Sequence, residues 1–308
     1  MRDAFIQTLL KEAKKDRSIM LLTGDLGFRV FEEFRNTLPH QFLNVGVAEQ
    51  NMMGVACGLA LSGQKVFAYT IATFATMRPF EQIRTDIASH NVKVVIVGTG
   101  AGLSYGHDSI THHSVEDIAL MRGIPNMIVL CPADPIETQW ATIEALRIPQ
   151  PVYLRLGKRG EPILYSKDPV LKVGKASILK NGRGVAILAT GNIVANAIAS
   201  AKLLQESGIN PLVASIHTIK PMDRKFIGFV MQKFPLIVAI EEHNTTGGLG
   251  SVIAEIISEQ GKNGRLIRLG VPDRFLFEIG SQTYLRNIVG ISPEKIAKRI
   301  EKELRKTV

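Results

Sequence analysis

Short apolar runs alternate with segments of helical periodicity along this whole chain, and this alternation constrains its fold more than any other feature. Such runs are typical of strands buried in a parallel sheet, with the intervening helices covering both faces of the sheet. We therefore predict an α/β protein whose mainly parallel sheets are flanked by helices. The strands predicted in the first half are Ser18–Thr23, Val66–Thr70, Val92–Val97, Met127–Leu130 and Val152–Leu156, and the helices include Asn51–Leu61, Met77–Ala88 and Ile136–Ala145.

The alternation is interrupted once, where Gly, Pro and charged residues crowd together between residues 157 and 175. Such a stretch is typical of a surface linker. We predict a first domain at 1–160, a linker at 161–175 and a second domain at 176–308; a chain of 308 residues fits two domains of ordinary size. The second domain should contain strands Val185–Ala189, Pro211–Ser215, Leu236–Ile240 and Arg265–Leu269, and helices Asn192–Ser207, Asp223–Gln232 and Ser251–Glu259.

The net charge of +9 raises the question of a nucleic-acid partner. The basic residues are scattered, however, and their densest group, at 295–306, is interleaved with glutamates on a predicted amphipathic last helix. Aromatic residues make up 6% of the chain, with no platform of basic and aromatic side chains. We therefore expect no nucleic-acid binding, whereas anionic substrates or an acidic partner subunit stay open.

Cys57 and Cys131 both lie in apolar runs, as expected of buried thiols in a reducing compartment. The N-terminal residues are polar and periodic, unlike a secretory signal, and the chain has no uninterrupted apolar run of about 18 residues. These features predict a cytoplasmic protein that does not cross a membrane.

One carboxylate stands among small and apolar residues where a helix is predicted to begin. Glu49 lies within Asn44-Val45-Gly46-Val47-Ala48-Glu49-Gln50-Asn51-Met52-Met53-Gly54. Burying an ionised carboxylate without a partner is costly, so such a group keeps its proton or finds a specific hydrogen bond. The alternative is a simpler role at the first turn of the helix, where a negative charge meets the helix dipole.

The phrase Asn-Val-Gly-Val-Ala-Glu-Gln-Asn-Met resembles the signature of the pyrimidine-binding domain of transketolases and their thiamine-diphosphate-dependent relatives. In the second half, Glu-Glu-His-Asn-x-x-Gly-Gly-Leu-Gly-Ser and 269–275 resemble phrases of the transketolase C-terminal domain, so the resemblance covers essentially the whole chain. It implies that Glu49 hydrogen-bonds the aminopyrimidine ring of thiamine diphosphate and shares a proton with it. That sharing drives activation of the cofactor, which supplies the difficult chemistry.

The resemblance also implies where the pyrimidine ring lies. Phe74, within the segment Tyr69–Gln82, is the residue implied to stack on the ring, and Ile71 stands three residues earlier, where relatives often carry another aromatic residue. Core packing is the alternative for Phe74. Asp25 matches a family aspartate at the end of the first strand, and a turn or cap is the alternative there.

A Gly-rich loop at 102–117 carries His107, Asp108, His112 and His113, which suit proton handling or the recognition of sugar hydroxyls. A metal site is the rival interpretation, which the spacing and the absence of cysteine disfavour. Relatives carry Gly-Glu-Asp-Gly-x-Thr-His here, so Asp108 and His112 are implied to face the substrate, with His107 in place of the glutamate.

Two departures from that pattern bear on the substrate. Ser109 replaces the second glycine of the phrase, and Gly100 stands near the place where phosphate-handling transketolases usually have another histidine. The resemblance thus implies a donor or acceptor other than the common pentose phosphates. Arg155 or Arg159, after a predicted strand, would meet a substrate anion, or both lie on a solvated linker face. Residues 241–243 are expected to organise the Gly-rich turn that follows them, away from the chemistry.

Thiamine diphosphate enzymes hold the diphosphate through Mg²⁺ bound by a Gly-Asp-Gly phrase and a later asparagine. No Gly-Asp-Gly occurs in this sequence. The resemblance therefore implies an N-terminal transketolase subunit that binds Mg²⁺ and shares the cofactor with this chain. By analogy with split relatives, we expect an α2β2 heterotetramer that acts on small sugars or sugar phosphates, and a subunit that is inactive alone.

The expected activity is that of a transferase moving a two-carbon ketol unit between sugars. The β subunit of a 2-oxoacid dehydrogenase has the same architecture, but Thr111-His112 and Gly-Val-Pro-Asp-Arg-Phe favour the transketolase. A 1-deoxy-xylulose-phosphate synthase is less favoured, because that enzyme keeps both halves on one chain. A non-catalytic α/β module is the third alternative, which the intact Glu49, Asp108 and His112 disfavour.

Overall fold

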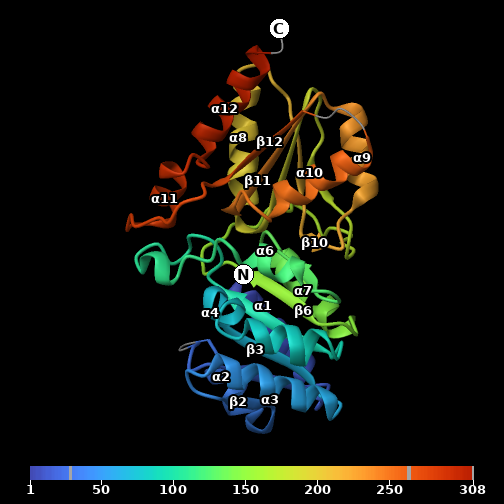
Figure 1. Cartoon of the computed structure of the whole chain (residues 1–308), viewed down its shortest axis with the longest axis vertical. Helices are drawn as coiled ribbons and strands as arrows, with labels where there is room; N and C mark the ends of the chain where they lie inside the picture. The colour runs from blue at the N-terminus through green and yellow to red at the C-terminus, as the bar shows by residue number, and fades with distance from the viewer. Residues whose placement is uncertain (28–29, 262–264, 307–308) are drawn as a thin grey trace.

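The computed structural model describes residues 1–27, 30–261 and 265–306, so that the last two residues of the predicted second domain lie outside it. Two α/β units are stacked along the long axis of the molecule, the first half of the chain below and the second above (Figure 1). The N-terminus lies at the junction of the two units, and the C-terminus lies at the far end of the upper unit. The predicted α/β architecture is confirmed.

The lower unit is built on a seven-stranded sheet in the order β10-β5-β6-β4-β3-β1-β2, in which β10 is antiparallel to β5 and the other pairs are parallel. Its strands are β1 (Ile19–Thr23), β2 (Phe42–Asn44), β3 (Lys65–Ile71), β4 (Val94–Thr99), β5 (Ile128–Leu130), β6 (Val152–Leu156) and β10 (Thr218–Lys220). The five strands predicted for the first half are present, each end within two residues of its prediction, whereas the sequence pattern did not reveal β2 or β10.

Helices cover both faces of this sheet. On one face, α1 (Arg2–Ala13) packs against α7 (Pro135–Arg147), with Leu9 and Ala141 in a common apolar cluster. The other face is covered by α3 (Glu49–Leu61) and α6 (Asp117–Gly123). Asp134 caps α7 by accepting a 2.8 Å hydrogen bond from the Glu137 amide, as its place after a strand suggested. The short helix α2 (Glu32–Thr37) follows β1.

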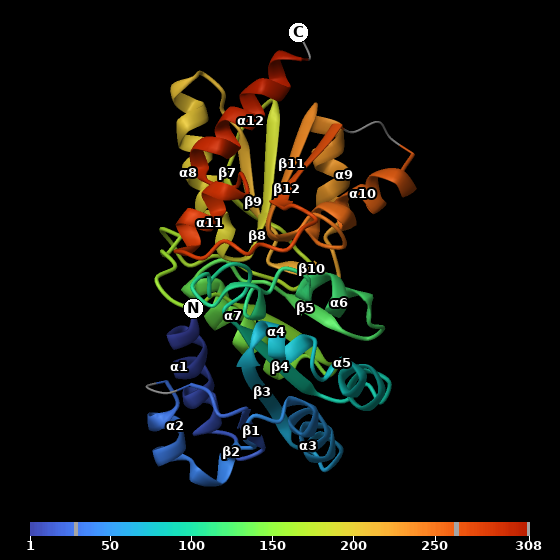
Figure 2. The same ribbon diagram turned by 60° about the vertical axis from the view of Figure 1, so that its left-hand side comes forward.

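The upper unit is a five-stranded sheet in the order β12-β11-β8-β9-β7, parallel except for the edge pair of β7 and β9. Figure 2 shows α8, α11 and α12 on one side of it and α9 and α10 on the other. The strands are β7 (Ser177–Lys180), β8 (Val185–Thr190), β9 (Leu212–Ser215), β11 (Leu236–Asn244) and β12 (Arg265–Val271). The helices are α8 (Val194–Glu206), α9 (Arg224–Lys233), α10 (Leu249–Glu259), α11 (Gln282–Ile288) and α12 (Pro293–Arg305).

The two units are joined by more than the connecting chain. Thr218–Lys220 leaves the upper unit and pairs as β10 with β5 of the lower sheet. One apolar cluster also runs through both units, from Met52 beneath the lower sheet to Ile253 on α10. The second half of the chain is therefore in a position to support residues of the first.

Two elements differ from their predicted bounds. The helix expected at Met77–Ala88 begins only at Phe80, as α5 (Phe80–Gln82), and continues as a π-helical turn (Ile83–Ala88); a separate short helix, α4 (Ala72–Thr76), precedes it. Pro79 lies between α4 and α5, because proline has no amide hydrogen to continue a helix. The strand expected at Leu236–Ile240 is longer than predicted, because β11 continues to Asn244.

The predicted burial of the two cysteines is confirmed, since Cys57 and Cys131 are buried free thiols. Within the residues that the structure describes, no helix has the length and apolar character needed to span a membrane.

Candidate active site

The polar residues singled out in the first half gather at one edge of the lower sheet. The chain leaves β1 toward β2 on one side and returns to β3 on the other, so β1 and β3 flank a point where the strand order reverses. Crevices at such points, beyond the carboxyl ends of parallel strands, are the usual ligand sites of open α/β sheets. Here Asp25 follows β1, Glu49 opens the helix after β2, Phe74 follows β3, and the Gly-rich loop follows β4.

Glu49 is the first residue of α3 and is 4% exposed, which confirms that it is poorly placed for solvent. Its carboxylate oxygen Oε2 accepts a 3.0 Å hydrogen bond from the Arg78 guanidinium. A buried carboxylate at the positive end of a helix dipole, with one cationic partner, meets both conditions for holding charge away from water. Arg78 was not singled out in the sequence, although it stands four residues after Phe74.

Phe74 and Arg78 form one wall of the space in front of Glu49. The guanidinium lies 3.7 Å from the centre of the Phe74 ring, within cation–π range. Arg78 also lines a cavity of about 500 Å³, together with Val47, Ala48, Glu49, Gln50 and Asn51. Gly24 also lies close to the Glu49 carboxylate: a Cβ built on it would be 3.7 Å from Oε1, in ordinary van der Waals contact.

The two other residues expected near the cofactor are placed differently. Ile71 ends β3 and is 7% exposed, so it offers a buried apolar side chain at the end of this strand. Asp25 is exposed; its carboxylate accepts a 3.0 Å hydrogen bond from the Asn44 amide and lines a separate cavity of about 120 Å³ that does not include Glu49.

The Gly-rich loop is closed at its neck by a pair of backbone hydrogen bonds, each 2.9 Å long, between Gly102 and Ser114. His112 lies on the side of the loop that faces Phe74, with the two ring centres 5.1 Å apart. Its Nδ1 is 2.8 Å from the Thr111 hydroxyl. His107 and Asp108 are both exposed at the tip of the loop. The structure thus brings His112, Phe74, Arg78 and Glu49 into one chain of contacts.

Gly100 has a structural reason to be glycine. Its φ is +75°, and a Cβ there would lie 1.9 Å from Cε2 of Tyr105. The Tyr105 ring therefore covers Gly100, which leaves no room for a side chain there. Lys158 lies over the same ring, 4.0 Å from its centre, and so brings a cation to this side of the loop. Tyr105 and Lys158 were also missed in the sequence.

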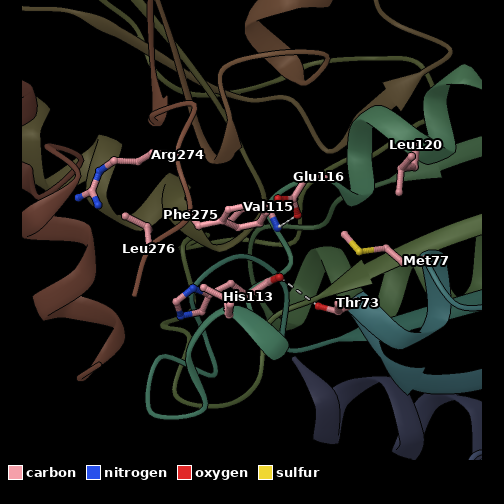
Figure 3. A pocket seen from close by; sticks show the side chains of 10 residues that line it. Thr73, Met77, His113, Val115, Glu116, Leu120, Arg274, Phe275 and Leu276 are labelled. Atoms are coloured by element: carbon pink, nitrogen blue, oxygen red, sulfur yellow. Dashed lines mark hydrogen bonds between the residues drawn. The ribbon is translucent and has the colours of Figure 1, made fainter. Parts of the chain in front are cut away.

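His113 is buried at the junction of the two units. It lines a cavity of about 380 Å³ with Thr73, Met77, Ile110, Val115, Glu116, Leu120, Arg274, Phe275 and Leu276, most of them shown in Figure 3. The Thr73 hydroxyl donates to the His113 carbonyl at 3.1 Å, and burial lowers the pKa of the imidazole. Within residues 1–27, 30–261 and 265–306, no group of three or more His, Cys, Asp or Glu side chains is arranged to hold a metal ion.

Arg155 does not lie on a solvated linker face, which was one of the two predictions made for it. It is 2% exposed in β6 and donates to both carboxylate oxygens of Asp117, at 2.7 and 3.1 Å. The same guanidinium donates at 3.0 Å to the carbonyls of Ser114 and Glu242. Although burial alone would raise it, Arg155 holds the pKa of Asp117 below its ordinary value. The guanidinium is thus committed to internal partners at the neck of the loop.

The three residues 241–243 make hydrogen bonds to different parts of the chain. Glu241 accepts hydrogen bonds from the amides of Leu249 and Gly250 at 2.7 and 2.9 Å, which confirms that it organises the Gly-rich turn. His243 receives the Ala119 amide at Nε2, and burial lowers its pKa to about 4, so it stays neutral. Glu242 points the other way, into the Gly-rich loop of the lower unit, where it accepts the Leu103 amide at 2.6 Å. The expectation that Glu242 serves only its own turn was wrong.

Comparisons with known proteins agree with this arrangement. The family described as the transketolase pyrimidine-binding domain matches residues 1–161, and the transketolase C-terminal domain matches residues 174–296. Fold and site thus define a protein made of the pyrimidine-binding and C-terminal domains of transketolases, in the order in which they occur here.

The chain belongs to the transketolase family, whose members depend on thiamine diphosphate, and it corresponds in extent to the C-terminal part of split members. It is 38% identical over 309 residues to a putative transketolase C-terminal section of Methanocaldococcus jannaschii, covering 99% of this chain and 96% of that protein. It is 36% identical over 274 residues to one of the subunits of apulose-4-phosphate transketolase of Phocaeicola vulgatus, covering 88% and 87%. A solved split gene transketolase, described as an inactive beta4 tetramer, superposes with a TM-score of 0.87 at 35% identity, covering 98% of this chain and 96% of that one.

Proposed function

We propose that this chain is the subunit of a split transketolase that activates thiamine diphosphate through Glu49 and receives sugars at the Gly-rich loop. The reaction is the transfer of a two-carbon ketol unit from a ketose to an aldehyde acceptor. The observation that carries the proposal is the buried Glu49 carboxylate, which lines a cavity of about 500 Å³ with Arg78, the residue that lies over the Phe74 ring.

The residues around Glu49 fit an aminopyrimidine ring. Such a ring needs a flat apolar surface and a carboxylate that shares a proton with one ring nitrogen. The guanidinium of Arg78, itself flat and rich in N–H groups, already lies between these two surfaces, 3.0 Å from Glu49 and 3.7 Å from the Phe74 ring. If thiamine diphosphate binds here, Glu49 would hold the shared proton, Phe74 and Ile71 would supply the apolar surface, and the cofactor would supply the nucleophile.

The residues of the loop are proposed to handle the sugars. His112, Asp108 and His107 stand on it, and His112 is in ring contact with Phe74. A sugar bound between the cofactor and the loop would meet an imidazole and a carboxylate, both of which hydrogen-bond hydroxyl groups. Arg155 is left out of this role, because its guanidinium is occupied by Asp117.

The diphosphate and its Mg²⁺ are assigned to a separate N-terminal subunit. The absence of Gly-Asp-Gly from the sequence and the similarity to split transketolase subunits support this division. We propose an α2β2 assembly in the cytoplasm, with the cofactor between the two kinds of chain.

The test is Glu49→Gln in the complex with the N-terminal subunit. The variant keeps the size of the side chain but loses the acidic proton, so turnover should fall by roughly 10²- to 10⁴-fold, the usual contribution of a general acid or base. Assembly should survive. Near-normal turnover and near-normal exchange of the cofactor's C2 proton would mean that Glu49 does not activate the cofactor and only stabilises the first turn of α3.

The donor distinguishes the main alternative. The chain also resembles 1-deoxy-D-xylulose-5-phosphate synthase of Caldanaerobacter subterraneus, at 33% identity, but covers 48% of that protein. A synthase of that kind, or a 2-oxoacid dehydrogenase, releases carbon dioxide from a 2-oxoacid. Activity with a 2-oxoacid and none with a ketose would replace the transketolase assignment.

A further inference from the structure

The loop that carries Asp108 and His112 is held from the other unit of the chain. Glu242 is a residue of β11 in the upper sheet, is 0% exposed, and lies 139 positions after its partner Leu103. Its oxygen Oε1 accepts 2.6 Å and 2.7 Å hydrogen bonds from the Leu103 amide and the Gln282 side chain, and Oε2 accepts one from Arg286. A buried carboxylate with three donors is a strong, directional anchor, because each hydrogen bond is charge-assisted.

The backbone of the loop is shaped to receive this carboxylate. Gly102 has a φ of +64°, and a Cβ there would lie 2.5 Å from Oε1 of Glu242, so both the conformation and the space require glycine. The main chain of Glu242 takes part as well, since its carbonyl accepts from Arg155, which also donates to the Ser114 carbonyl. Both sides of the loop's neck are therefore tied to one residue of the upper unit.

Further contacts from the upper unit continue along the loop. Gln282 donates to the Ser104 hydroxyl at 3.1 Å, and the Gly280 amide donates to the Gly106 carbonyl at 3.2 Å. Leu103 itself is fully buried in a small apolar cluster with Val115, Val271, Leu276 and Leu285. By contrast, the side chains of His107 and Asp108 at the tip are exposed. The loop is thus held at residues 103–106, while the polar side chains at its tip stay accessible to a ligand.

We propose that Glu242 is a positioning residue of the active site: it fixes the loop at Leu103 and thereby sets where His112 and Asp108 stand relative to Phe74 and Glu49. Its role in catalysis is exerted through the loop, and it makes no contact with substrate. A residue of the upper unit thus fixes the position of active-site residues in the lower unit. This inference rests on the proposed function, because it takes the loop to face the sugars.

The first experiment needs neither partner nor substrate. Hydrogen exchange of the isolated chain is compared for the wild type, Glu242→Ala and Glu242→Gln. Alanine removes every side-chain acceptor, so amides of 103–113 should exchange roughly ten- to a hundredfold faster, the range for a lost buried hydrogen bond, while β8 and α7 keep their protection. Glutamine keeps one acceptor for the Leu103 amide and should restore most of the protection.

Glu241→Ala is the matched control. Glu241 neighbours Glu242 on the same strand and is equally buried, but its carboxylate binds the amides of Leu249 and Gly250. Its loss should speed exchange at the start of α10 and leave the loop unchanged. If Glu242→Ala does not fold, Gln282→Ala, which removes one donor and leaves no buried charge unpaired, should show the same local effect more weakly. Unchanged exchange in the loop would overturn the inference.

The second experiment uses the complex with the N-terminal subunit. Glu242→Ala should raise the KM for sugar roughly three- to thirtyfold, with cofactor affinity and C2 proton exchange retained and Glu242→Gln intermediate. If His112→Ala impairs transfer but Glu242→Ala does not, the positioning role is wrong and the proposed function stands. If neither affects transfer, the loop does not face the sugars, and it is the proposed function that fails.

Discussion

Arg78 and Glu49 form an ion pair of 3.0 Å in which the carboxylate side chain is 3% exposed and the guanidinium side chain is 46% exposed. The Glu49 side chain is thus buried, whereas the Arg78 side chain is accessible to solvent. Removing the exposed partner leaves a buried carboxylate without its cation, whereas removing the buried partner leaves an arginine that water can solvate. The two single changes should therefore differ in cost.

A double-mutant cycle with Arg78→Met and Glu49→Gln measures this relationship. Arg78→Met should lower the free energy of unfolding more than Glu49→Gln does, and the coupling should be about 0.5 to 1.5 kcal/mol, since half-exposure of the arginine screens the pair. Urea unfolding of the four chains provides the measurement. A coupling indistinguishable from zero would mean that the pair contributes nothing to stability.

Cofactor binding should depend on the second subunit. The Glu49 cavity accounts for the pyrimidine ring, but the sequence has no Gly-Asp-Gly phrase for the metal and diphosphate. Calorimetric titration of thiamine diphosphate with Mg²⁺ should therefore give no tight binding to this chain alone and tight binding after the N-terminal subunit is added. A tight one-to-one site on the isolated chain contradicts the split arrangement.

His112→Ala should separate substrate recognition from cofactor activation. The His112 ring contacts the Phe74 ring, and its Nδ1 is hydrogen-bonded to the Thr111 hydroxyl. The Glu49 carboxylate is hydrogen-bonded to Arg78 instead. Loss of one hydrogen bond to a sugar hydroxyl costs about 1 to 3 kcal/mol, so ketol transfer should fall roughly ten- to a hundredfold while C2 proton exchange persists. Both activities are measured on one preparation, with chelator and zinc controls. Parallel loss of the two, or rescue by zinc, would remove His112 from this role.

Stability should depend on pH through Glu137, which joins α7 to the linker. Its carboxylate accepts the Tyr165 hydroxyl at 2.5 Å and the Ala133 amide at 2.7 Å, and burial raises its pKa to about 7. Between its ordinary value of 4.5 and about 7, the folded chain holds a proton that the unfolded chain releases, so this contribution is full at low pH and lost as pH rises.

Glu137→Gln cannot ionise and lacks this dependence. The free energy of unfolding of the wild type minus that of the variant should be about 1 to 3 kcal/mol larger at pH 5 than at pH 8. Chemical denaturation at the two pH values checks it. An equal difference at both would show that Glu137 ionises normally in the folded chain.

Local patterns in the sequence determined most of the secondary structure. Continuous apolar runs such as Val185–Ala189 and Leu236–Ile240 became central strands, because only strands covered on both faces bury every side chain. Where local rules conflicted, the stronger one decided: the apolar period at 77–88 suggested one helix, but the helix begins only after Pro79. The phrase around Glu49 likewise marked a buried carboxylate at a helix start, which the structure contains.

Tertiary structure alone decided which distant residues meet. The pairing of Thr218–Lys220 with β5, the burial of Arg155 against Asp117, and the reach of Glu242 to Leu103 all join segments far apart in the chain. The periodicity of the sequence does not predict such contacts, because each depends on how distant elements pack and not on the neighbouring residues in the sequence. The sequence by itself thus determined the two α/β units and the carboxylate of the candidate site, whereas the packing of one unit on the other decided how the Gly-rich loop is held.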